Sequence, residues 1–267
     1  MKKSLIEDVG VSENRIQCLL GSHNPTPPDD PSIPSRTNIM KTLRGLIDNP
    51  DIERGDNIII HYAGHGASYY CSEHFSAQST CQTGACPIDA LCPIDRDTMD
   101  SDKHWIPDIS ERELYTLFTQ ISHKKGHHIT FITDCCHASS FDRQDGDSAI
   151  RTTHPTFHSD VHNMLRAADQ LLKHFPRYPS VLLKDWQPDT GSHVILAACL
   201  DYQYAKEIGG EEGYGGIFTK TLVDVLKSGA WRKETTYVGL THLLNQSYTQ
   251  TPVVAGDHKY DRIWYQV

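Results

Sequence analysis

Residues 128–136 read His-Ile-Thr-Phe-Ile-Thr-Asp-Cys-Cys (HITFITDCC). From Ile129 to Thr133 it is a continuous run of apolar and β-branched side chains, without the alternation of a strand that faces water on one side. Such a run is typical of a strand that other elements cover on both faces. An acid and two thiols follow it at Asp134, Cys135 and Cys136, so a buried strand ends in residues that can carry out chemistry.

Three further runs have the same character and predict strands at residues 15–20, 57–62 and 193–199. Helical patterns lie between the strands and predict helices at 35–49, 110–126, 160–175, 217–227 and 237–246. Ser110 and Glu113 match a capping box at the start of the second helix. Long loops are predicted at 24–34, 67–107 and 139–191. Strands that alternate with helices indicate an α/β fold with a mostly parallel sheet and helices on both faces.

Composition excludes several functional classes. The chain has 267 residues and a net charge of −9, and this acidic balance argues against nucleic acid as a partner. No apolar run reaches the roughly 18 residues of a membrane span, so no membrane association is expected. The first residues lack the apolar stretch of a signal peptide. Four cysteines lie at the ends of apolar runs, which is typical of reduced thiols in a cytosolic protein. These features predict a cytoplasmic protein, with a nuclear location also compatible.

The candidate chemistry lies just beyond the predicted strands. In an open α/β sheet, ligands bind at the carboxyl ends of the strands. His65 stands between Gly64 and Gly66 after the second strand, and Cys136 follows the third. An imidazole has the right pKa to deprotonate a thiol, and exposed N–H groups of Gly66 and Cys136 could stabilise an oxyanion. A Gly-His-Gly turn or a packed cysteine alone is usually structural, but here both follow strands at one sheet edge.

Several motifs resemble those of metacaspases, which belong to the caspase-like cysteine peptidases. Residues 62–66 (YAGHG) resemble their Y-S-G-H-G motif, and residues 134–139 (DCCHAS) resemble their D-S-C-H-S-G motif. Residues 91–95 (LCPID) and 199–203 (CLDYQ) are similar to two further family segments, and with residues 250–254 the whole looks most like fungal caspase-domain proteins. The resemblance implies one caspase-like three-layer domain. Its parts are a large-subunit-like part at about 1–142, a linker at 143–190 and a small-subunit-like part at 191–267.

The resemblance also implies residue roles. His65 corresponds to the general base and Cys136 to the nucleophile of a cysteine endopeptidase acting on proteins or peptides, with Gly66 and Cys136 as oxyanion donors. Cys135 stands where the family usually has serine. Because adjacent side chains of a strand point to opposite faces, we expect Cys135 to be a packing residue. The family suggests roles in cell death (apoptosis) or protein quality control.

Asp134 corresponds to the acid at the floor of the family's S1 pocket. A carboxylate there attracts Arg or Lys and repels Asp, which predicts cleavage after Arg or Lys. The alternative role for Asp134 is a cap at the strand end. Two further sets of contacts are implied: substrate contacts at Ala63, Asp201 and Gln203, and an activating Ca²⁺ site that uses Asp89, Asp95 and Asp108. A merely solvated acidic loop is the alternative to the calcium site.

Two alternatives to an active peptidase remain open. The family has a central strand before its first helix, and this chain starts at a point that matches the inside of that helix. We therefore expect a truncated sheet, or one whose gap another segment fills, and an inactive caspase-like scaffold that binds partners becomes a rival interpretation. Cys71, Cys81, Cys86 and Cys92, with His74, suggest a zinc-stabilised regulatory module, although their spacing is not that of paired C-x₂-C sites and a disulfide pair or free thiols are alternatives.

Overall fold

The architecture centres on one mixed four-stranded sheet. The computed structural model describes residues 1–21, 27, 29–70, 87–135, 153–156, 158–200, 203–210, 213–232, 234–244 and 250–265. In this part of the chain the strands are β1 (Ile58–Ala63), β5 (Ile129–Asp134), β6 (Val194–Ala197) and β9 (Val253–Ala255), in the order β1-β5-β6-β9. The first three are parallel and β9 is antiparallel to β6. The predicted strands at 57–62, 128–133 and 193–199 are therefore confirmed within one or two residues at each end.

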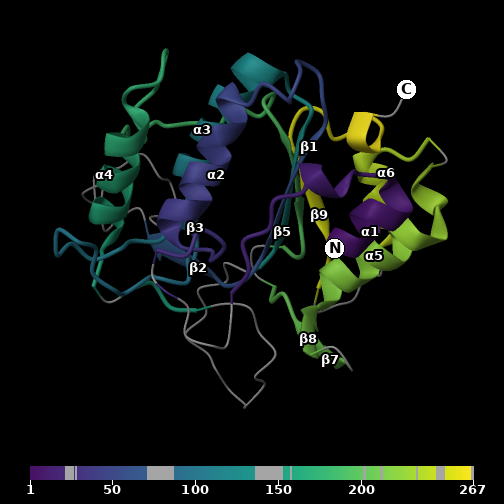
Figure 1. Ribbon diagram of the computed structural model, residues 1–267, viewed down its shortest axis with the longest axis horizontal. Helices are drawn as coiled ribbons and strands as arrows, with labels where there is room; N and C mark the ends of the chain where they lie inside the picture. Colours follow the sequence, from purple (N-terminus) through teal and green to yellow (C-terminus); the bar gives the residue numbers. More distant parts are fainter. Residues whose placement is uncertain are drawn as a thin grey trace.

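Helices cover both faces of this sheet (Figure 1). On one side lie α2 (Arg36–Asp48) and α3 (Glu111–Lys125), with α4 (Val161–Leu172) beyond them. On the other side lie α5 (Ile217–Ser228), α6 (Tyr237–Leu243) and the N-terminal α1 (Lys2–Ser4), which continues into a π-helical turn, η1 (Leu5–Val9). Each side has its own core of buried apolar residues, so the predicted α/β sandwich is confirmed.

Smaller elements complete the fold. A second, antiparallel sheet has the order β2-β3-β4, and its strands are β2 (Gly66–Tyr70), β3 (Pro87–Leu91) and β4 (Ile109–Ser110). A hairpin joins β7 (Glu207–Gly210) to β8 (Gly213–Gly216). Short 3₁₀ turns are η2 (Glu13–Arg15), η4 (Ala230–Arg232) and η5 (Ile263–Tyr265).

Helix ends follow the local signals in the sequence. Ser35 caps α2 by accepting from the Asn38 N–H at 3.3 Å, and Asp160 caps α4 through the Asn163 N–H at 2.7 Å. Gly229, at φ 68°, ends α5 in the left-handed region that favours glycine. The last helix is shorter than predicted, because α6 ends at Leu243 rather than at residue 246.

The capping box at α3 is only half formed. Ser110 accepts from the Glu113 N–H at 3.2 Å, as predicted. The Glu113 carboxylate, however, bonds to the Arg36 guanidinium, with both oxygens 2.9 Å from Nη2. Its side chain is 0% exposed, and burial raises its pKa. A buried carboxylate without a cation is costly, so the bond to Arg36 is favoured over the bond to the Ser110 N–H that a complete capping box would have. The pair ties the first turn of α2 to the first turn of α3.

The predicted strand at residues 15–20 is wrong. Arg15 ends the 3₁₀ turn η2, residues 16–20 pair with no described strand, and Leu20 is 70% exposed. Among the described strands, β5 alone pairs with β1, so β1 lies at one edge of the central sheet. An apolar run becomes a strand only where a neighbouring backbone supplies hydrogen bonds, and the Leu20 N–H instead donates to the Ser32 carbonyl at 2.8 Å.

The predicted loop at 67–107 is also partly wrong, because it contains β2 and β3. Tyr69 and Ile88, from these two strands, are 1% exposed and pack against Met164 and Leu165 of α4. These strands are stabilised by a helix that begins 91 residues after the end of β2 (161 − 70) and 70 residues after the end of β3 (161 − 91), and the local sequence carries no sign of that contact.

Candidate active site

The register of the sheet aligns the two strand ends that carry the predicted catalytic residues. Ala63, the last residue of β1, pairs with Asp134, the last residue of β5, in a parallel ladder. His65 and Cys136 each follow two residues after this pair. Cys136 lies outside the described residues, and so does the predicted substrate residue Asp201. Because neighbouring strands lie about 4.8 Å apart, the register puts Ala63 and Asp134 side by side at the carboxyl ends of their strands, where ligands bind in open α/β sheets.

A hydrogen bond from the Tyr62 side chain supports the turn that carries His65. The single Tyr62 hydroxyl hydrogen is shared between the His65 carbonyl at 2.8 Å and the Cys92 carbonyl at 3.1 Å, while the Cys92 N–H donates to the His65 carbonyl at 3.1 Å. A Cβ at Gly64 would lie 2.7 Å from the Tyr62 hydroxyl, so a larger residue here would displace the Tyr62 ring. Burial raises the pKa of Tyr62 well above its usual range, which keeps its hydroxyl protonated as the donor. His65 is thus presented as an exposed residue on a fixed backbone.

Gly66 and Ala63 flank His65 in different environments. Gly66 is buried and opens β2, and its carbonyl accepts from the Thr153 N–H at 3.0 Å. Ala63 is exposed at the sheet edge. Neither the oxyanion role of Gly66 nor a substrate contact at Ala63 is tested by this geometry, and both stay predictions.

Cys135 lies in the core, away from the exposed edge. It is 3% exposed and belongs to the cluster of apolar residues under α2 and α3. Its Sγ lies 3.0 Å from the Thr133 hydroxyl. Asp134, the residue before it, faces the α5 side, which agrees with the alternation of side chains along a strand.

Asp134 is fully buried beneath the start of α5. Its Oδ2 accepts from the Thr219 N–H at 3.0 Å and from the Thr219 hydroxyl at 2.5 Å. The residue at the N-cap of α5 is Gly216, which has no side chain to cap the helix. Asp134 therefore supplies the cap from the neighbouring strand, and its negative charge suits the positive end of the helix dipole.

Two residues of this arrangement were not anticipated from the sequence. A Cβ at Gly216 would overlap the Asp134 carboxylate, so glycine is needed where β8 passes over it. His61 of β1 reaches the same group, with its Nε2 3.2 Å from the Thr219 hydroxyl. The one available signal was the Gly215-Gly216 pair just before the predicted helix, because paired glycines there indicate a close approach of the backbone.

Gln203 braces the loop after β6. Its side-chain carbonyl accepts from the Thr251 N–H at 2.8 Å and the Leu200 N–H at 3.3 Å, and its amide donates to the Thr251 hydroxyl at 3.1 Å. The residue is 8% exposed. These bonds connect the end of β6 to the approach to β9, and a contact of Gln203 with substrate stays a prediction.

The three predicted calcium ligands each hold a different partner. Asp89 accepts from the Ser68 hydroxyl at 2.5 Å, and Asp95 accepts from the Arg36 N–H at 2.9 Å. Asp108 accepts from Arg96 Nε and Nη2 at 2.9 and 2.8 Å, and from the Tyr69 hydroxyl at 2.8 Å. In the described part of the chain, the groups of ligands close enough to share an ion do not include these carboxylates. A Ca²⁺ site that uses these residues stays a prediction.

One member of the predicted zinc cluster is visible. Cys92 lies with its Sγ 3.7 Å from Asp108 Oδ2, and burial together with this carboxylate raises the pKa of the thiol. A protonated thiol is a poor metal ligand, since zinc binds the thiolate. Cys71, His74, Cys81 and Cys86 lie outside the described residues, so the zinc module stays a prediction.

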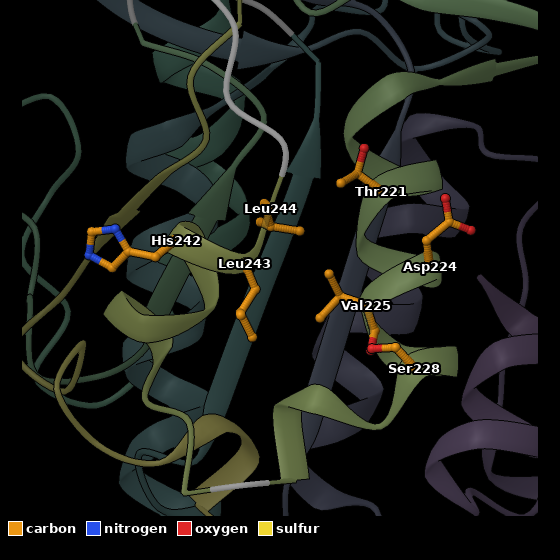
Figure 2. A pocket seen from close by; sticks show the side chains of 7 residues that line it. All are labelled: Thr221, Asp224, Val225, Ser228, His242, Leu243 and Leu244. Carbon is orange, nitrogen blue, oxygen red and sulfur yellow. The ribbon is translucent and has the colours of Figure 1, made fainter.

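A pocket of about 690 Å³ lies between α5 and α6. Figure 2 shows Thr221, Asp224, Val225 and Ser228 on one helix, and His242, Leu243 and Leu244 at the end of the other. Among the predicted site residues that the structure describes, none lines it.

Comparison with known proteins decides the family. The family model "Metacaspase, peptidase C14 domain" matches residues 1–143, which is more than half of the chain and includes both motif segments. The chain belongs to the metacaspase family. Metacaspases are cysteine peptidases, so protein substrates follow from the family, and the predicted family is confirmed. Among curated proteins, none matches this metacaspase sequence.

A solved structure supports the fold of this metacaspase independently. The crystal structure of protein GSU0716 from Geobacter sulfurreducens aligns with a TM-score of 0.50 and 16% identity, over 83% of this chain and 73% of that one. At this identity the likeness concerns the fold alone. Within the described residues, the metacaspase has no helix that is both long and apolar enough to cross a membrane.

Proposed function

We propose that this metacaspase is a cysteine endopeptidase that cleaves after Arg or Lys, with His65 as general base and Cys136 as nucleophile. The observation that carries the proposal is the register of β1 and β5. It pairs Ala63 with Asp134. His65 follows Ala63 by two residues, and Cys136 follows Asp134 by two residues.

The proposed reaction is an acyl transfer in two steps. His65 takes the proton of the Cys136 thiol, and the thiolate attacks the carbonyl carbon of the scissile peptide bond. The tetrahedral oxyanion is stabilised by the N–H groups of Gly66 and Cys136, and it collapses as His65 gives the proton to the departing amine. Water, deprotonated by His65, then attacks the thioester and releases the acid and the free thiol.

The fixed backbone of His65 supports its role as general base. Its carbonyl accepts from Tyr62 and Cys92, and these bonds hold the backbone turn that carries the imidazole. Holding the base in place before substrate binds saves the entropy that would otherwise oppose proton transfer.

Asp134 is the proposed recognition group for the P1 side chain. A buried carboxylate that already accepts two hydrogen bonds from Thr219 is held in one orientation, and a guanidinium or ammonium would complete its charge compensation. A substrate must therefore reach a carboxylate that is 0% exposed beneath Gly216, which requires the β8–α5 junction to move aside.

The same burial favours the second candidate function, a caspase-like scaffold without peptidase activity. If the β8–α5 junction stays closed over Asp134, its charge serves only to cap α5, and no basic side chain can bind there. The two functions differ in one measurable property, namely turnover of a peptide with Arg at P1.

The experiment is hydrolysis of two fluorogenic peptides that differ only at P1, one with Arg and one with Asp. We expect kcat/KM for the Arg peptide to exceed that for the Asp peptide at least about 100-fold, and the Asp134→Asn variant to lose about 30-fold or more on the Arg peptide. Assays with and without Ca²⁺ test the proposed activator separately. Turnover of the Asp peptide alone would reject the role of Asp134, and turnover of neither peptide would favour the scaffold.

A further inference from the structure

We propose that His127, His258 and Asp261 form a binding site for a zinc-type divalent cation at the end of the sheet opposite the catalytic edge. The three side chains offer two imidazole nitrogens and a carboxylate oxygen, and these ligand atoms all lie within 4.8 Å of one another. Two histidines and one carboxylate are a ligand set that Zn²⁺ accepts, with water in the fourth position.

The topology of the sheet brings these residues together. His127 lies just before the start of β5, whereas Cys136 follows its end. Because β9 is antiparallel to β6, the residues after Ala255 return to the edge where β5 and β6 begin. A strand of six residues spans roughly 20 Å, so the proposed site lies about that far from the catalytic edge.

The turn that carries His258 and Asp261 is anchored at both ends. The Asp257 N–H donates to the Thr190 carbonyl at 2.9 Å, and the Asp261 carbonyl accepts from the Tyr237 N–H at 3.1 Å. Gly256, at φ 110°, lets the backbone pass the His193 carbonyl, which a Cβ would approach to 2.5 Å. A site on such a fixed turn keeps its ligands in place before the ion arrives.

The three side chains are already neighbours. The His127 and His258 rings stack with centroids 4.0 Å apart and an interplanar angle of 13°, and His258 Nδ1 lies 2.9 Å from Asp261 Oδ2. With all separations at or below 4.8 Å, some point lies within about 2.8 Å (4.8/√3) of all three atoms. Zinc bonds are about 2.0–2.2 Å long and lie in the plane of the imidazole, so the ligand atoms must move by less than about 1 Å and one of the stacked rings must turn to bind the ion.

Among the three proposed ligands, Asp261 supplies the negative charge. The nearby Arg54 side chain donates to the His123 carbonyl at 2.9 Å. A bound ion would join the start of β5 to the segment after β9, which are 131 residues apart (258 − 127), and would act as a structural clamp.

The test is zinc titration of the full-length chain, freed of metal with a chelator. We expect one equivalent of Zn²⁺ to bind, the melting temperature to rise on binding, and His258→Asn and Asp261→Asn each to weaken binding at least about tenfold. His104→Asn is the matched control, because His104 belongs to the other ligand group of the described residues, with Asp100 and Asp102. It should leave the affinity unchanged.

Co²⁺ as a probe separates this site from the cysteines. An ion held by nitrogen and oxygen gives no thiolate-to-cobalt charge-transfer band, whereas an ion at Cys136 or near Cys92 gives one. Circular dichroism of the apo variants checks that they fold, and Asp261→Asn replaces His258→Asn if the latter does not. Absence of binding, a thiolate band for the bound equivalent, unchanged affinity in folded His258→Asn and Asp261→Asn, or loss in His104→Asn alone would each overturn the proposal. No outcome depends on peptidase activity, so the proposal stands apart from the proposed function.

Discussion

Replacing Cys136 by alanine is expected to lower kcat/KM for a peptide with Arg at P1 at least about 10⁴-fold. The reason is that the acyl-enzyme cannot form without the thiolate, and binding plus the oxyanion donors leave only a residual rate. His65→Ala is expected to cost nearly as much, and the double variant no more than either single one, because the two residues act as a unit. The measurement is hydrolysis of the fluorogenic peptide under conditions where wild-type turnover is linear.

The adjacent cysteine provides the matched control. Cys135 is buried in the core beside Thr133, so Cys135→Ala should change stability but keep most of the activity. Both variants remove one thiol from neighbouring positions, but only Cys136 is the proposed nucleophile. Loss of activity in Cys135→Ala with retention in Cys136→Ala would exchange the two roles and contradict the assignment of the nucleophile.

Replacing Arg96 by alanine is expected to destabilise the fold by about 3–5 kcal/mol. Arg96 donates twice to Asp108, whose side chain is 0% exposed, so the substitution leaves a buried carboxylate without its cation. Urea unfolding followed by circular dichroism measures the loss. Arg262→Ala is the control, because Arg262 pairs with Glu234 at the surface, where the two side chains are 42% and 79% exposed, and removing such a pair should cost less than about 1 kcal/mol.

The cost of Arg96→Ala should depend on pH in a defined direction. Burial raises the pKa of Asp108 even with Arg96 present, and removing the cation raises it further. A neutral Asp108 tolerates burial. The stability that the variant loses is therefore smallest below the usual carboxyl pKa of about 4, and it grows as the pH rises through the raised pKa of Asp108. A stability cost that is the same at about pH 3 and at about pH 7, on either side of the usual carboxyl pKa of about 4, would show that Asp108 does not carry the effect.

Local signals in the sequence predicted much of the fold. The continuous apolar runs that became β1, β5 and β6 could be identified because burial on both faces selects such residues. The helix starts at Ser35 and Asp160 could be predicted because the signal is local: each side chain bonds to the backbone only three residues away. The motifs around His65 and the strand end at Asp134 likewise depend on residues close together in the chain, and the sheet register then aligns them.

The features that escaped prediction depend on distant partners. The Glu113 carboxylate bonds to Arg36, which lies 77 residues away, and does not complete the predicted capping box. Asp134 caps a helix through Thr219, which lies 85 residues away. The run at 15–20 has the composition of a strand, but no described strand pairs with it. Local propensity cannot reveal whether a neighbour exists, and these tertiary contacts therefore overrode the sequence patterns.

The most direct test of the central claim uses an irreversible peptide inhibitor with Arg at P1 and a thiol-reactive group in place of the scissile bond. Mass spectrometry of the digested protein locates the adduct among the eight cysteines. We predict one adduct, on Cys136, formed much more slowly in His65→Ala and blocked by competing substrate with Arg at P1. An adduct on Cys135 or on another cysteine, or labelling at Cys136 that is indifferent to both His65 and the P1 residue, would contradict the account.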